Sequence, residues 1–175
     1  GALVIGTIGL STTTAALATL SLETTTGLIT VGAITADALT TMTVETTTGA
    51  QTIAAVTSAA LTDVTLTSTT GAIIQTGTIA ADALINYSAE STTGALTLGA
   101  ITVGVTASNP LKTVLITTGT GRVISTGDIT ATAGVVAAAM TSYTIVTGAN
   151  TLDNTYGALN LNTDGTLGTY SITAG

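Results

Sequence analysis

The stretch TVETTTGA, residues 43–50, decides the fold because the chain repeats it almost unchanged. Related stretches are SLETTTGL at 21–28, TLTSTTGA at 65–72 and SAESTTGA at 88–95. The glycine that closes each stretch falls at Gly27, Gly49, Gly71 and Gly94, so the steps along the chain are 22, 22 and 23 residues. A fixed period of this length is typical of repeat proteins, in which each unit stacks on the next.

Other positions keep the same period. Three columns are apolar: Leu17, Leu39, Leu61 and Leu84; Leu20, Met42, Val64 and Tyr87; and Leu22, Val44, Leu66 and Ala89. A fourth column, beside the last of these, contains Glu23, Glu45, Thr67 and Glu90. Several columns in one register indicate that the same local structure recurs in every repeat.

Within one repeat, residues 27–48, apolar and polar side chains alternate, as Met42 and Val44 do with their neighbours. A period of two describes strands with one buried face. A single coil of three short strands cannot bury that face alone, but copies stacked about 4.8 Å apart pair every strand in parallel. We therefore predict an all-β fold, a parallel β-solenoid of about six coils with a period near 22 residues, forming a rod of roughly 30 Å.

The recurring ETTTG phrase is interpreted as a corner between strands. We expect its polar residues to end a strand and its glycine to supply the backbone freedom for the bend. An insertion around VTASNPLKT (105–113) breaks the period, and we expect it to bulge from such a corner.

The end of the chain has a different pattern, which divides the chain into solenoid repeats at 1–149 and a C-terminal element at 150–175. Residues 156–173 alternate on both sides of NTDG (162–165), which predicts an antiparallel hairpin with Asp164–Gly165 at its turn. We expect this hairpin to cap the solenoid or link it to the next subunit. Alternatively, it begins a separate β module.

Composition excludes several classes of protein. The chain has 175 residues, 45% of them hydrophobic and 6% charged, with a net charge of −7 and only Lys112 and Arg122 as basic residues. Such a balance argues against nucleic acid as a partner. The apolar run 133–140 is too short for membrane insertion. Since the sequence starts at Gly1 without an initiator Met, we expect a processed chain or an excised piece of a longer one.

Two stretches, TLTSTTGAIIQTGTIAADAL (65–84) and GALTLGAIT (94–102), resemble the β-helical repeats of filamentous-haemagglutinin-like exoproteins and autotransporter adhesins of bacteria. The tail NTYGALNLNTDGTLGTYSI (154–172) is similar to a hairpin of cadherin-like modules in long bacterial adhesins. The first resemblance covers residues 1 to about 147. Together they imply secretion, an extracellular or cell-surface location and no catalysis.

The chain contains few residues that could catalyse a reaction or bind a metal. Without His or Cys there is neither a zinc site nor a Ser–His–Asp triad. Asp37 and Asp82 share a column, and Asp63 lies elsewhere in its coil, but basic and aromatic groups to bind a polysaccharide are scarce. We therefore predict that the protein is not an enzyme, and we assign no catalytic, cofactor-binding or metal residues and no cofactor.

Two surface columns allow further hypotheses. The Glu23/Glu45/Glu90 column is either a weak cation-binding ladder or a solvated acidic corner, and we favour the second. Outward Thr rows such as those of 41–43 and 65–67 resemble the surfaces of ice-binding solenoids, although Thr is also simply a good strand residue.

The function expected from these patterns is structural: an extracellular subunit that stacks end to end on copies of itself into a filament. One alternative is a stalk segment of a bacterial surface adhesin. Another is an ice- or glycan-binding solenoid, in which case a cell-surface or glycan ligand is the partner.

Overall fold

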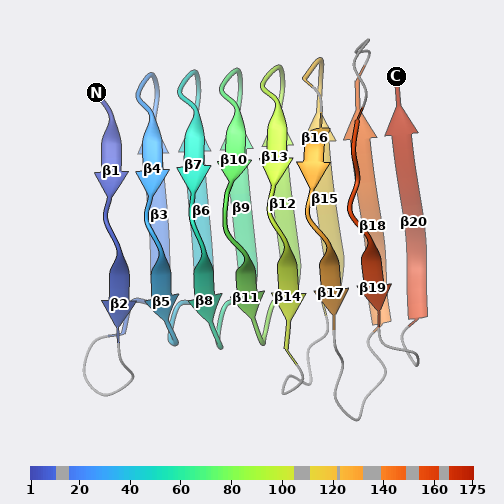
Figure 1. The fold of residues 1–175 in the computed structure, drawn as a ribbon, viewed down its shortest axis with the longest axis horizontal. Coiled ribbons are helices and arrows are strands. Elements are labelled where there is room, and N and C mark those ends of the chain that lie inside the picture. The colour runs from blue at the N-terminus through green and yellow to red at the C-terminus, as the bar shows by residue number, and fades with distance from the viewer. Residues whose placement is uncertain (11–15, 105–110, 122, 132–138, 149–153, 162–165) are drawn as a thin grey trace.

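The structure is a computed structural model that describes residues 1–10, 16–104, 111–121, 123–131, 139–148, 154–161 and 166–175. No described residue is helical; the regular structure consists of strands, which form three sheets of six, seven and seven strands. The strands pair in parallel throughout. The protein is a parallel β-solenoid of about six turns, as predicted, with its termini at opposite ends of the rod (Figure 1).

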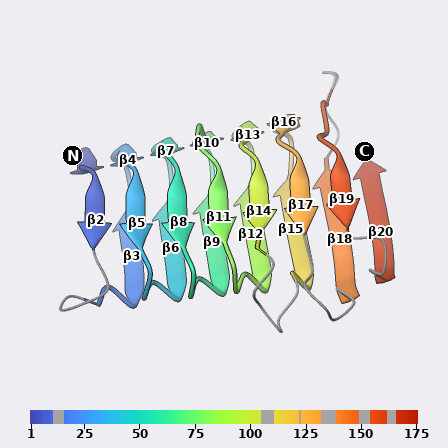
Figure 2. The same ribbon diagram turned by 60° about the horizontal axis from the view of Figure 1, so that its bottom comes forward.

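The three sheets are termed A, B and C. Sheet A contains β1 (Leu3–Ile5), β4 (Ile29–Val31), β7 (Gln51–Ile53), β10 (Ile73–Gln75), β13 (Leu96–Leu98) and β16 (Val123–Thr126). Sheet B contains β2 (Ile8–Leu10), β5 (Ile34–Ala36), β8 (Val56–Ser58), β11 (Ile79–Ala81), β14 (Ile101–Val103), β17 (Ile129–Ala131) and β19 (Leu159–Leu161). Sheet C contains β3 (Thr19–Thr24), β6 (Thr41–Thr46), β9 (Asp63–Ser68), β12 (Asn86–Ser91), β15 (Thr113–Thr118), β18 (Ala139–Thr147) and β20 (Thr166–Ala174). The strands of A and B follow one another along one side of the rod, and the longer strands of C run the opposite way behind them (Figures 1 and 2).

The register of sheet C confirms the predicted columns. Leu20, Met42, Val64 and Tyr87 are Cα partners on successive strands, and the column continues through Val114, Tyr143 and Tyr170. The later turns are longer than the first four. The insertion expected at 105–113 lies mostly outside the described residues.

The core is a single stack of apolar side chains from all three sheets. It forms because each strand alternates inward apolar residues with outward polar ones, mostly Thr and Ser, and Thr suits the outer face of a strand. Leu39, Leu61 and Leu84 have no exposed surface at all. Their burial depends on the turns above and below, because each turn is only one strand thick.

The glycines at the corners have a different role from the one predicted. No described glycine has a positive φ, so backbone freedom is not what the bend requires. A Cβ on Gly49 would instead fall on the carbonyl oxygen of Gly27, and one on Gly71 would fall on that of Gly49. Backbones stacked this closely leave no room for a side chain.

The threonines of the corner tie each turn to the one before it. Thr48 donates its backbone N–H (2.9 Å) and its hydroxyl (3.2 Å) to the carbonyl of Thr25. One turn later, Thr70 makes the same pair of bonds to Thr47, at 2.8 and 3.3 Å. The phrase therefore recurs because its glycine permits the close approach and its threonine adds a hydrogen bond.

The predicted antiparallel hairpin does not form. β19 and β20 belong to different sheets and run parallel to β17 and β18, so they extend the solenoid into a seventh turn. Alternation is the same in parallel and antiparallel strands, and here the apolar columns decide: Leu159 lies beside Ile129, and Ile172 beside Ile145. The predicted turn at 162–165 lies outside the described residues.

Among the residues that the structure describes, no helix could span a lipid bilayer.

Candidate assembly interfaces

The two ends of the rod are the places where the repeating structure is interrupted. β1, β2 and β3 are the outermost strands at one end, and β19 and β20 are outermost at the other. Within the described residues, no further strand pairs with the outer edges of β3 and β20. Such edges present backbone N–H and C=O groups to any strand of matching direction.

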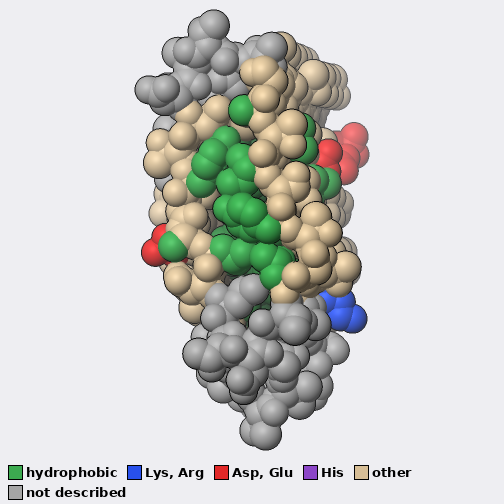
Figure 3. Space-filling view, turned by 90° about the vertical axis from the view of Figure 1, so that its right-hand side faces the viewer, with side chains coloured by type: hydrophobic (Ala, Val, Ile, Leu, Met, Phe, Trp, Pro, Cys, Tyr) green, Lys and Arg blue, Asp and Glu red, His purple; other side chains and the backbone are tan. Residues whose placement is uncertain are grey.

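The C-terminal end exposes apolar side chains that would be core residues in any interior turn. Tyr170 is 56% exposed and Ile172 is 38% exposed, whereas their partners Tyr143 and Ile145 are buried. Leu159 also packs only partly against the core. Viewed along the rod, hydrophobic side chains gather in the middle of this end, between areas of other side chains and backbone (Figure 3).

An aromatic stack lies at this end. The rings of Tyr143 and Tyr170 are 5.2 Å apart between centroids and 8° from parallel, because the two residues are Cα partners on neighbouring strands. Burial raises the pKa of Tyr143, the nearby Tyr170 adds to the effect, and a hydrogen bond with Thr126 opposes it. The stack leaves Tyr170 exposed at the end of the rod.

The N-terminal end has a matching apolar character. Leu20 and Leu22 of β3 are each 8% exposed, more than the same positions of the next strand. Five further residues at this end pack only partly against the core: Leu3, Ile5, Ile8, Leu10 and Leu17. Both ends are therefore cross-sections through the hydrophobic core.

The glutamate column is confirmed as a column, on the outer face of sheet C. Glu23 and Glu45 are Cα partners, Thr67 follows, and Glu90 comes next. Glu90 accepts a hydrogen bond from the Ser88 hydroxyl at 2.8 Å. In the described part of the chain, no three acidic side chains are grouped so that they could hold a metal ion.

Two of the three aspartates considered for catalysis share a surface pocket, and the third lies elsewhere. Asp37 and Asp82 line one shallow surface pocket, with Ala59 of the intervening turn between them. Asp63 lies on another sheet, where it accepts hydrogen bonds from Thr62 (2.6 Å) and Asn86 (2.7 Å). Asp63 therefore lies outside the pocket that Asp37 and Asp82 share.

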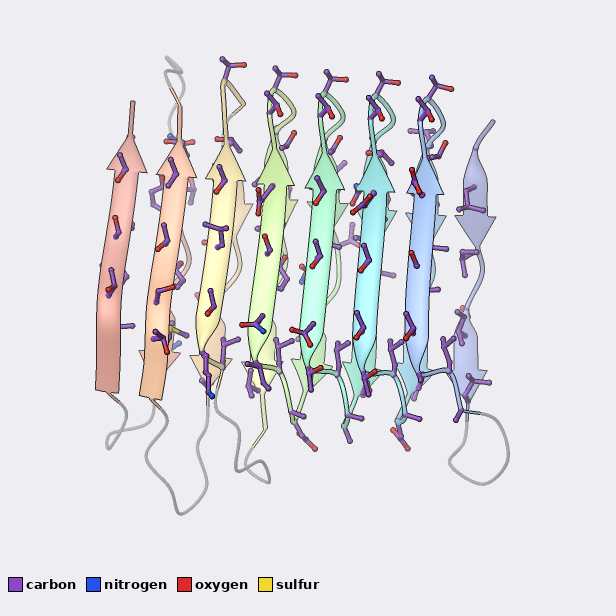
Figure 4. All side chains as sticks on the ribbon, turned by 180° about the vertical axis from the view of Figure 1, so that it is seen from behind. Carbon is purple, nitrogen blue, oxygen red and sulfur yellow. The ribbon has the colours of Figure 1, made fainter. Side chains whose placement is uncertain are left out.

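The outward side chains of sheet C stand in rows along the rod (Figure 4). The row through Thr41 is interrupted by Asp63 and Asn86, and the row through Thr43 by Leu115. At the corners, threonine hydroxyls donate hydrogen bonds to the neighbouring turn, as the Thr48 hydroxyl does to the carbonyl of Thr25. The rows therefore do not form an unbroken hydroxyl surface.

A polar group inside the solenoid was not predicted from the sequence. Tyr87 donates its hydroxyl to Oε1 of Gln75 at 2.8 Å, and Nε2 of Gln75 donates to the carbonyl of Gly77 at 3.0 Å. Complete burial raises the pKa of Tyr87 far above its ordinary value.

Gln51 is also fully buried and donates to the carbonyl of Val44 at 3.1 Å. The repeat contains the signal that would have located Gln51, because it occupies an otherwise apolar column between Ile29 and Ile73.

Comparisons with known proteins identify no relative. No protein-family model matches the chain, and neither the curated proteins nor the solved structures give a significant match.

Proposed function

We propose that this protein is the subunit of an extracellular filament, formed when solenoids stack end to end. The observation that carries the proposal is that no strand of the described residues covers either end. Each end presents an edge strand of sheet C and an apolar cross-section, and these are the features that hold the turns together inside one subunit. Strand addition between copies would bury both.

The parallel strands favour a head-to-tail contact. β20 and β3 of two copies related by translation along the rod run in the same direction, as β3 and β6 do within one subunit. A two-fold contact would instead oppose two identical edges in antiparallel fashion. Head-to-tail contacts that do not close produce an open filament.

The structural role is supported by the scarcity of chemical groups. The chain has no His or Cys, and among the described residues no three acidic side chains are grouped so that they could hold a metal ion. We therefore propose no catalysis. The extracellular, cell-surface location rests on the resemblance of residues 65–84 and 94–102 to exoprotein and adhesin repeats.

The proposal is tested by blocking one end at a time. Ile172→Lys places a charge on the C-terminal end, and Ile8→Lys places one on the N-terminal end. Thr57→Lys is the matched control, because Thr57 is exposed on the outer face of a central strand. Circular dichroism verifies that each variant retains its fold.

Sedimentation and negative-stain microscopy then give the result. We expect filaments from the wild type and from Thr57→Lys, single subunits from each end variant alone, and dimers from an equimolar mixture of the two end variants. Dimers of either end variant alone would indicate a two-fold contact and contradict the proposal. A wild type that remains a short rod at all concentrations would also contradict it, and the adhesin-stalk hypothesis would then be preferred.

A further inference from the structure

We infer that the junction between two copies continues all three sheets in the register that the solenoid uses internally, so that a second copy adds as the next turns. This inference rests on the proposed filament and specifies its partner residues. In sheet C, Tyr170 would cover Leu20, and Ile172 would cover Leu22 of the next copy.

The apolar columns carry this register across the junction. Tyr170 and Ile172 are the last members of the columns that begin at Leu20 and Leu22. Leu167 is the partner of Met140 and packs partly against the core, as Leu17 does at the other end. Thus Leu167, Tyr170 and Ile172 have the same spacing as Leu17, Leu20 and Leu22.

Sheet B gives the same match independently. β19 places Leu159 and Leu161 on the column positions of Ile129 and Ala131. The first strand of that sheet, β2, places Ile8 and Leu10 on the positions of Ile34 and Ala36. A copy that fits sheet C therefore brings β2 onto β19, with Ile8 in the same apolar column as Leu159.

Sheet A completes the junction. Thr155 runs beside β16, since its N–H donates to the carbonyl of Val123 and its carbonyl accepts from the N–H of Thr126, both at 3.2 Å. This segment is the neighbour on which β1 of the next copy would lie. A slide of one residue would place the inward residues of one copy beside the outward residues of the other, so the register is strongly specified.

The charges are compatible with this register. Inside one subunit Glu23 lies beside Glu45, which brings two like charges together. Across the junction Glu23 would lie beside Thr173, the last residue of that column on β20. The junction therefore adds no carboxylate pair to the glutamate column.

Disulfide trapping tests the register. Because the chain has no cysteine of its own, only the introduced pair can form a disulfide. The double variant Thr19→Cys with Thr169→Cys places a thiol on each side of the proposed junction, at exposed outward positions. Neighbouring strands are about 4.8 Å apart, within the range that a disulfide spans. A second in-register pair, Ser21→Cys with Ser171→Cys, repeats the test one position further along the strands.

Two controls bracket the experiment. Ser21→Cys with Thr169→Cys is out of register by two residues, about 8 Å on a diagonal, which a disulfide does not bridge. Thr19→Cys with Thr41→Cys joins Cα partners inside one subunit and verifies that such a bridge forms between these strands.

We expect both in-register pairs to give a ladder of covalent oligomers under mild oxidation, and the out-of-register pair to lose it. Filaments in which the out-of-register pair cross-links instead would overturn the register while the filament itself stands. Absence of filaments by microscopy before oxidation would overturn the proposed function and this inference together.

Discussion

The interior turns and the last turn of this solenoid have the same sequence pattern but different burial. Leu39, Leu61 and Leu84, in the middle of the rod, have no exposed surface. Tyr170 and Ile172 occupy equally regular inward positions on β20 and are 56% and 38% exposed. The difference is the presence of a neighbouring turn. In this fold, the effect of a substitution therefore depends on its position along the rod as much as on its chemistry.

The strongest test of this comparison introduces an aspartate in an interior turn and, separately, in the last turn. Leu39→Asp puts a carboxylate among apolar neighbours with no partner, which costs several kcal/mol and is a large share of the stability of a domain this size. We expect an unfolded chain by circular dichroism. Ile172→Asp at the open end should keep the folded spectrum; a Leu39→Asp variant that melts like the wild type would refute the interior burial described above.

Glycine substitutions compare the same regions through the backbone. A Cβ on Gly71 would fall on the carbonyl of Gly49, so Gly71→Ala must push two turns apart, and we expect a loss of about 2–4 kcal/mol in unfolding free energy. Gly9, on the first turn, has nothing within 4 Å of its added Cβ. Gly9→Ala should change the stability by about 0.5 kcal/mol or less. Equal effects in denaturant titrations would contradict the stacking at the corners.

These glycines mark the limit of what the sequence predicts. The period reveals the fold, the columns and the position of each corner, because stacked turns impose the same demand on every repeat. It does not reveal why Gly71 is a glycine, since a close approach between turns and a left-handed bend select the same residue.

The antiparallel hairpin was predicted wrongly for a related reason. The alternation of residues 159–161 and 166–174 indicates strands but says nothing of their direction, which Ile129 and Ile145 set by packing. The open ends were expected from the solenoid itself. Which side chains those ends expose is known only once the positions of β19 and β20 are known.

The buried Tyr87 makes the stability of the rod sensitive to alkali. Burial raises the pKa of Tyr87, so the folded protein holds that proton where the unfolded chain releases it. Its contribution to stability is therefore complete below about pH 10 and is lost as the pH rises from there towards the folded-state pKa.

We expect Tyr87→Phe to reduce the fall of unfolding free energy above pH 10 by about 1.4 kcal/mol per pH unit. Denaturant titrations at pH 9, 10 and 11 make this measurement. A steeper alkaline fall in Tyr87→Phe than in the wild type would contradict the assignment.

The smallest effect is expected on the outer surface. Glu45 is exposed and lies beside Glu23, so Glu45→Gln removes a like-charge neighbour without disturbing the core. The change in unfolding free energy should be about 0.5 kcal/mol or less, and its sign should favour the variant at low salt. An unfolded Glu45→Gln variant would refute the interpretation of this column as a solvated surface feature.

The most direct measurement of the central claim is helical reconstruction of wild-type filaments by electron cryomicroscopy. Sheet C contributes seven strands per subunit, so an uninterrupted solenoid has an axial rise of about 34 Å per subunit, with strands about 4.8 Å apart across every junction. The account predicts that rise, with β20 of one copy directly beside β3 of the next. Filaments in which the copies contact one another through the outer faces of their sheets would contradict it.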